Sequence, residues 1–185
     1  LGTFDSGESA FHYQKTDTAQ QHATSSEYLF GKGSLKVVHD GAGYGDGGKY
    51  HWNGSLADWS SMNYIVFWVK NDSANPCSIG YLYLYDDGDE NGTEDAWYYT
   101  ISFPGSGDPL WKQQVASLGD GSSNPGDFND PGWDSDDGLG TTAIDKNKIF
   151  GICPYNDDSN TTFYVDEIRV TGQASLCTFA AMGYD

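Results

Sequence analysis

The sequence predicts an all-β fold built from antiparallel strands, as in a sandwich or a barrel. Short runs of β-branched and aromatic residues recur along the 185 residues, and turns rich in Gly, Asn and Asp separate them. No segment repeats apolar residues at helical spacing over three turns. The composition, with 24 Gly and 13 Tyr, is typical of strands joined by tight turns.

Six runs give the clearest strand predictions. In the run at 63–70, for example, Ile65, Phe67 and Val69 alternate with other residues and are expected to face a core. Weaker strand signals lie near the start, around Phe4, and at 27–30 and 49–52. The only helix candidate, at 110–118, is short. The six clear runs are 34–40, 63–70, 78–85, 96–103, 148–155 and 162–170.

We expect one domain over residues 1–185, with 173–185 as a C-terminal tail extension. The sequence shows no internal repeat and no linker long enough to divide it. The acidic, glycine-rich segment at 119–140 is interpreted as a long loop within that domain. The chain begins at Leu1 without a targeting signal, so we expect a mature product or a module of a longer protein.

The row of Tyr81, Tyr83 and Tyr85 is the most informative feature for function. Successive side chains of a strand point to opposite faces, so Leu82 and Leu84 can face the core while the three rings share the other face. Phenol rings stack on the flat faces of sugars, and their hydroxyls bond to sugar oxygens. The alternative is that the rings pack under a loop or a strand. If they bind sugar, removal of the Tyr83 ring should weaken binding and leave stability largely intact.

Other residues are candidates for the rim of the same site. The glycine-rich bend at 41–53 carries Asp46 and Trp52, which could present a carboxylate and a ring together. Tyr98 is expected on the exposed side of its strand, and Asp86 directly follows the tyrosine row. Carboxylates at such a rim would orient the sugar by accepting hydrogen bonds from paired hydroxyls.

The segment 87–92 resembles the start of a calcium-binding loop. Asp87, Asp89 and Asn91 follow a D-x-D-x-N-G spacing, in which oxygens wrap around Ca²⁺ and the glycine allows a sharp turn. Position twelve is Tyr98 rather than an acid, so the segment is no EF-hand. The alternative is a solvated hairpin tip.

The charge balance excludes several classes of partner. Nine Lys and Arg stand against 27 Asp and Glu, a formal net charge of −18. Nucleic acids, anionic membranes and polyanionic sugars would be repelled. No run of about 18 apolar residues is present, so we expect no membrane span. The balance is compatible with a neutral ligand, with calcium and with a secreted, extracellular location.

Three cysteines allow one disulfide and one remaining thiol, and their spacing does not decide the pairing. We expect a bridge between Cys153, in a predicted strand, and Cys177, in the tail. Such a bridge would leave Cys77 as a free thiol or paired outside the module.

The order of motifs along the chain resembles jelly-roll carbohydrate-binding modules with a galactose-binding-like fold, in particular families four, eleven and thirty. The motifs are GTFDSGES, GKGSLKVV, NYIVFWVK, LWKQQVASLGD, KIFGI and FYVDEIRV, and they cover 3–170. The resemblance implies two antiparallel sheets, a concave face that binds polysaccharide, and a structural Ca²⁺ that joins the first strand to the last. The matching ligand positions are Asp5, Asp166 and Ser34.

We therefore predict a non-catalytic module that binds a neutral polysaccharide, such as a β-glucan or a related β-linked hexan, and targets an attached catalytic domain. The first alternative is a jelly-roll glycoside hydrolase or polysaccharide lyase. No strand carries the paired carboxylates of a hydrolase, and a single arginine, Arg169, suits lyase chemistry badly. The second alternative is a cell-surface adhesion domain stabilised by calcium.

Overall fold

The computed structural model describes residues 11–14, 23–25, 27–31, 33–41, 45–51, 56–87, 95–105, 110–132 and 143–173, with the backbone alone for 11–14, 23–25 and 46–51. The elements in this part of the chain are all strands. They are β1 (Phe11–Gln14), β2 (Ala23–Ser25), β3 (Ser34–His39), β4 (Asp46–His51), β5 (Tyr64–Asn71), β6 (Gly80–Asp86), β7 (Asp95–Thr100), β8 (Lys112–Ser117), β9 (Ile149–Asn156) and β10 (Thr161–Thr171).

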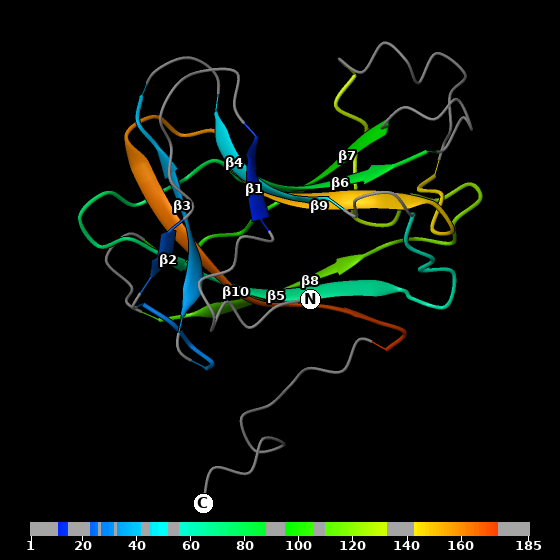
Figure 1. Ribbon diagram of the computed structural model, residues 1–185, viewed down its shortest axis with the longest axis horizontal. Helices are drawn as coiled ribbons and strands as arrows, with labels where there is room; N and C mark the ends of the chain where they lie inside the picture. The colour runs from blue at the N-terminus through cyan, green and yellow to red at the C-terminus, as the bar shows by residue number, and fades with distance from the viewer. Residues whose placement is uncertain are drawn as a thin grey trace, which may run out of the picture.

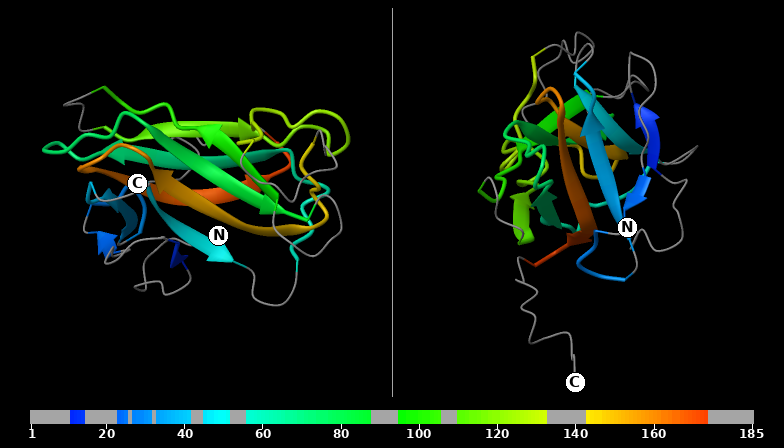
Figure 2. Two further views of the ribbon diagram at one scale, coloured as in Figure 1. Left: turned by 90° about the horizontal axis from the view of Figure 1, so that it is seen from above. Right: turned by 90° about the vertical axis from the view of Figure 1, so that its left-hand side faces the viewer.

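The strands form two five-stranded sheets that face each other (Figure 1). The first sheet has the order β1-β4-β9-β6-β7 and the second has β2-β3-β10-β5-β8. All strand pairs within the two sheets are antiparallel. Figure 2 shows the same two layers from above and from one end. The predicted all-β sandwich is confirmed.

The core lies between the inner faces of the sheets. Ile65, Phe67 and Val69 of β5 are completely buried, as the alternation of this strand predicts. From the first sheet, Leu82 and Leu84 of β6 meet them with no exposed surface. No helix in the described ranges is long and apolar enough to cross a membrane.

Two weaker sequence predictions are wrong. The helix candidate at 110–118 contains β8, which pairs along its length with β5. Its period is two rather than 3.6, because Gln114 and Ala116 are buried while their neighbours are partly exposed. The segment 27–30 is no strand, since the amides of Leu29 and Phe30 donate to the Asp166 carboxylate instead of to a neighbouring strand. The expected strand near Phe4 lies outside the described residues.

Candidate functional site

The alternation in β6 places the tyrosine row on the outer face of the first sheet. Leu82 and Leu84 have no exposed surface and pack in the core, as predicted. Tyr81 and Tyr83 are partly exposed, and Tyr85 retains 6% of its surface. The three phenol rings therefore share the side of the sheet that faces away from the core.

The strands on either side of β6 extend this row. Tyr81 lies opposite Tyr155 of β9, and Tyr83 lies opposite Tyr98 of β7. At the other end, the partners of Tyr85 are small, namely Ala96 and Gly151. We call the five rings the tyrosine face: Tyr81, Tyr83, Tyr85, Tyr98 and Tyr155.

Tyr83 is the centre of the tyrosine face. Its ring centroid lies 5.3 Å from that of Tyr155 and 6.0 Å from that of Tyr81, both edge to face. It also stacks on Tyr85 at 6.2 Å and contacts Tyr98 at 6.3 Å. Each aromatic pair contributes about 0.5–1.5 kcal/mol beyond area burial. Contrary to the expectation from sequence, the Tyr83→Ala substitution should thus cost stability as well as binding.

Tyr81 and Tyr98 form the outer part of the tyrosine face. Their ring centroids are 5.3 Å apart at an interplanar angle of 75°, and both side chains are partly exposed. Partial burial, with the nearby negative charge of Asp157, raises the pKa of the Tyr81 phenol, so this hydroxyl keeps its proton. A protonated phenol can both donate to and accept from a sugar hydroxyl.

Asp86 is not on the tyrosine face, which corrects its assignment as a ligand-binding residue. It is completely buried and shares the inward side of β6 with Leu84. Its carboxylate accepts hydrogen bonds from Trp97 Nε1 at 3.0 Å and from the amide of Asp145. Burial raises its pKa to about 7, and the nearby charges of Asp95 and Asp145 add to that effect. Strand alternation gives the physical reason. Asp86 lies an even number of positions from Leu82 and Leu84, so its side chain points to the same side of the sheet.

The remaining binding and loop candidates are only partly described. The backbone of Asp46 lies in β4, opposite Asn156 of β9, while Trp52 lies outside the described residues. Asp87 is 8% exposed and follows the end of β6. Asp89 and Asn91, its partners in the predicted calcium loop, lie outside the described residues.

Asp166 and Ser34 lie in neighbouring strands of the second sheet, β10 and β3, and both are completely buried. The Asp166 carboxylate accepts from the amides of Leu29 at 2.8 Å, Phe30 at 2.9 Å and Glu167 at 2.8 Å. Burial raises its pKa, although these three amides oppose the shift. The Ser34 hydroxyl donates to the Glu27 carbonyl. Asp5 lies outside the described residues.

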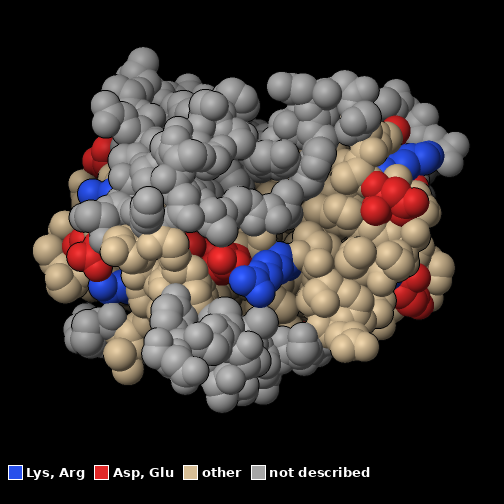
Figure 3. Space-filling model, turned by 60° about the horizontal axis from the view of Figure 1, so that its bottom comes forward, with Lys and Arg blue, Asp and Glu red and all other residues tan. Residues whose placement is uncertain are grey.

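Among the described residues, no three acidic, histidine or cysteine side chains converge on a point that could hold a metal ion. On the face drawn in Figure 3, the basic side chains lie next to acidic ones. Lys70 pairs with Glu27, and Arg169 pairs with Glu167. These two cations are thus neutralised locally, and the described residues visible in Figure 3 form no basic patch for a polyanion.

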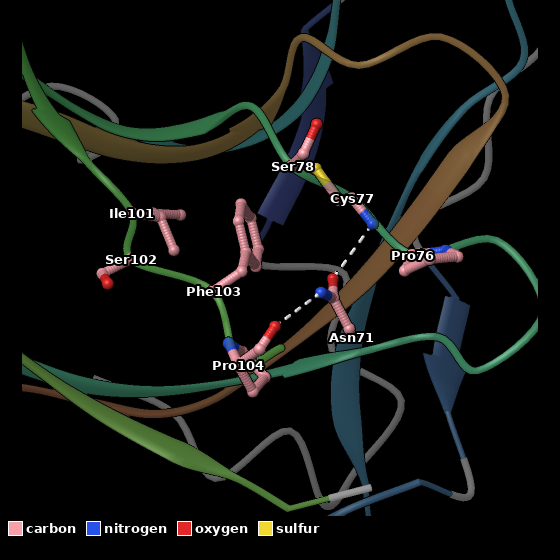
Figure 4. A pocket seen from close by; sticks show the side chains of 8 residues that line it. All are labelled: Asn71, Pro76, Cys77, Ser78, Ile101, Ser102, Phe103 and Pro104. Carbon is pink, nitrogen blue, oxygen red and sulfur yellow. Dashed lines mark hydrogen bonds between the residues drawn. The ribbon is translucent and has the colours of Figure 1, made fainter. Parts of the chain in front are cut away.

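A pocket of about 480 Å³ opens at one end of the sandwich, between the β5–β6 connection and the segment 101–104 (Figure 4). The polar side chain of Asn71 lines this pocket and is hydrogen-bonded to two backbone groups of the protein. Asn71 Oδ1 accepts from the amide of Cys77 at 3.0 Å, and Nδ2 donates to the Pro104 carbonyl at 3.2 Å. Because its amide holds two loops together, we assign this pocket no ligand.

Cys153 has a thiol that is completely buried in the cluster formed by Tyr83, Tyr85 and Tyr155. The tail leaves from β10, which belongs to the other sheet. The expected bridge to Cys177 is therefore wrong for this structure; Cys177 itself lies outside the described residues. Cys77 also has a thiol, and burial raises its pKa to about 12.

The sequence did not lead us to predict two residues of this site, Tyr155 and Asp157. Tyr155 lies two positions after Cys153, so the alternation of β9 could have placed both on one face. Asp157 directly follows β9, and its carboxylate is exposed beside Tyr155. Only the pairing of β9 with β6, which the sequence does not reveal, brings them next to Tyr81.

Comparison with known proteins shows a shared fold. No protein-family model matches the sequence, and no curated protein matches it. Among solved structures, the family 11 carbohydrate-binding module of the cellulosomal cellulase Lic26A-Cel5E of Clostridium thermocellum matches with a TM-score of 0.61 and 18% identity, covering 94% of each chain. The family 11 module from that organism in complex with a β-1,3-1,4-mixed-linked tetrasaccharide also gives 0.61 and 18%, over 95% of this chain and 96% of that one.

An exo-β-agarase matches with a TM-score of 0.58 and 19% identity, over 95% of this chain but only 25% of the agarase. The chain thus has the β-sandwich fold of carbohydrate-binding modules, which agrees with the resemblance seen in the sequence.

Proposed function

We propose that this chain is a non-catalytic carbohydrate-binding module that binds a neutral polysaccharide, a β-glucan or a related β-linked hexan, across the tyrosine face. The observation that carries the proposal is that five phenol rings from three adjacent strands gather on one outer sheet face. Rings of this kind supply apolar contact area at low entropic cost, and their hydroxyls supply hydrogen bonds. The tetrasaccharide complex of the similar family 11 module supports the choice of a β-glucan.

The enzyme alternative loses its main support. Asp86, which directly follows the tyrosine row, is the acidic residue that could place a catalytic carboxylate beside it, but its side chain faces the interior. A retaining hydrolase needs two carboxyl groups about 5–5.5 Å apart around the scissile bond, in contact with substrate. A buried side chain that bonds to Trp97 and Asp145 cannot take part in such a pair.

Affinity electrophoresis through gels that contain a panel of soluble neutral polysaccharides, mixed-linkage β-1,3-1,4-glucan among them, tests the proposal. We expect retardation in the β-glucan gel and no release of oligosaccharide from the polymer. Release of oligosaccharide would support the hydrolase or lyase. Neither retardation nor release would support the adhesion domain.

We further infer that the module is secreted and attached to a catalytic domain that acts on the same polysaccharide. The high negative charge suits an extracellular protein that does not bind polyanions. The agarase match supports attachment, because a sandwich of this fold makes up about a quarter of that longer chain.

We also propose a structural Ca²⁺, bound either by Asp166 with Asp5 and oxygens near Ser34, or by Asp87 with Asp89 and Asn91. Asp166 is completely buried, and each hydrogen bond that it accepts from the described residues comes from a backbone amide. Carboxylate, carbonyl and hydroxyl oxygens are the ligands that Ca²⁺ prefers. The ion would compensate the charge of the carboxylates, and at the first of the two sites it would join the two ends of the chain.

Removal of calcium should therefore lower the melting temperature. Binding to the folded state alone stabilises by about 2.7 kcal/mol at a hundredfold excess over Kd, or roughly 5–10 °C for a domain of this size. Differential scanning calorimetry with Ca²⁺ and with EDTA measures the shift. Asp166→Asn and Asp87→Asn distinguish the two sites, since only the variant in the real site should lose the shift. An identical melting temperature with Ca²⁺ and with EDTA would contradict the proposal.

A further inference from the structure

We propose that Asp157 determines which sugars the tyrosine face accepts: its carboxylate accepts hydrogen bonds from neighbouring hydroxyls of a neutral sugar residue next to Tyr81 and Tyr155, and it repels acidic sugar residues. This inference rests on the proposed function.

The first observation is the position of Asp157 relative to the rings. Tyr155 and Asp157 both lie over Gly45. A Cβ atom at Gly45 would sit 2.6 Å from Tyr155 Cε1 and 2.9 Å from Asp157 Oδ1. The ring and the carboxylate therefore lie close to one point, which the Asn156 carbonyl oxygen approaches even more closely. Tyr81 pairs directly with Tyr155, and the charge of Asp157 acts on its phenol.

The second observation is that the backbone around Asp157 is fixed from both sides. Asn156 has no exposed surface, and its Oδ1 accepts from the amide of Asp158 at 3.0 Å. The Asp158 carboxylate accepts from the amide and the hydroxyl of Ser78, at 2.7 and 2.6 Å. The amide of Asp157 itself donates to the Ile79 carbonyl at 3.0 Å. The backbone that carries the Asp157 side chain is thus fixed at the edge of the tyrosine face before any ligand arrives, which reduces the entropic cost of binding.

The third observation concerns charge. Asp157 is exposed to solvent, though not fully; among the described residues, His39, which is buried, and Asp158, which is bonded to Ser78, act on its charge. Its charge in turn acts on the Tyr81 phenol and the Cys77 thiol. Partial burial raises the pKa of Asp157 from its ordinary value of 3.8. A carboxylate is an acceptor only, so it pairs with the hydroxyls of a neutral sugar and opposes the carboxylate of a uronic acid.

The test compares one polymer in two charge states. The probes are mixed-linkage β-1,3-1,4-glucan and the same glucan after oxidation of part of its primary alcohols to carboxylates, both at low ionic strength. The proteins are the wild type, Asp157→Asn and Asp158→Asn. The two variants change the net charge equally, but Asp158 is directed to Ser78 rather than to the rings. Affinity electrophoresis gives the affinities, and thermal melts verify that each variant is folded.

We expect the wild type to bind the neutral glucan at least about tenfold more tightly than the oxidised one, equivalent to about 1.4 kcal/mol. Asp157→Asn should bind the neutral glucan about five- to tenfold more weakly, since hydrogen bonds to a charged acceptor are lost. Its preference for the neutral glucan should fall to about twofold or less. Asp158→Asn should keep the preference of the wild type.

Two outcomes would overturn the inference and leave the proposed function intact. In the first, Asp157→Asn retains both the affinity and the preference of the wild type. In the second, Asp158→Asn loses the preference to the same extent, which would make net charge rather than position the cause. If the wild type binds neither glucan, the proposed function fails, and the role of Asp157 fails with it.

Discussion

The Leu82→Ala substitution should lower the free energy of unfolding by about 2–5 kcal/mol. Leu82 has no exposed surface and packs in the core between the sheets, so truncation removes buried methyl groups and leaves a cavity. For a domain of this size the loss corresponds to a fall in melting temperature of roughly 4–20 °C. Thermal or urea unfolding, followed by circular dichroism, measures it.

Leu110→Ala is the matched control, because it removes the same atoms from a leucine that is 67% exposed. It should alter stability by no more than about 0.5 kcal/mol. Equal effects of the two substitutions would mean that the leucines of β6 do not face the core. The tyrosine row would then lie inside, and the proposed function would lose its surface.

Replacement of Lys146 by Met should cost about 2–4 kcal/mol, which is large for a single lysine. Lys146 is only 7% exposed, and its ammonium donates to the Met62 carbonyl at 2.9 Å and more weakly to the Gly119 carbonyl at 3.4 Å. It also lies 3.5 Å from Asn63 Oδ1. Methionine keeps the apolar stem but leaves these oxygens without their donor, and a buried acceptor without a partner costs about 1–3 kcal/mol.

The control for this prediction is Lys148→Met, in the same segment. Lys148 is more exposed, and its contact with Asp145 is long, at 3.9 Å. A surface pair of this kind contributes about 0–1 kcal/mol. Chemical denaturation of both variants provides the comparison. Similar losses for the two lysines would show that the ammonium of Lys146 does not hold the segments around Met62 and Gly119 in place.

The sequence predicted the face of the tyrosine row because a strand has a period of two. Burial of Leu82 and Leu84 follows directly from that period. The same rule assigns Asp86 to the core, although its place before an acidic loop led us to predict it at the rim. Its hydrogen bond to Trp97, which no sequence pattern reveals, shows how the buried carboxyl group is accommodated there.

Strand pairing limited the prediction of the site. Tyr155 and Tyr81 are 74 positions apart and meet only because β9 lies between β4 and β6. Alternation within one strand does not tell which strand is its neighbour.

The strand β8 was missed because of one buried polar residue. Its buried polar residue, Gln114, interrupts the apolar alternation, although it is satisfied by the backbone of Ser102, through bonds of 2.9 and 3.1 Å.

The most direct test of the proposed function is the effect of Tyr81→Ala on binding of mixed-linkage β-1,3-1,4-glucan, measured together with its melting temperature. Tyr81 lies at the outer part of the tyrosine face, so its ring can be removed with less damage to packing than that of Tyr83. By analogy with other aromatic stacking platforms, we predict a loss of about 1–3 kcal/mol in binding and little change in melting temperature. A Tyr81→Ala protein that binds β-glucan as tightly as the wild type would contradict the account.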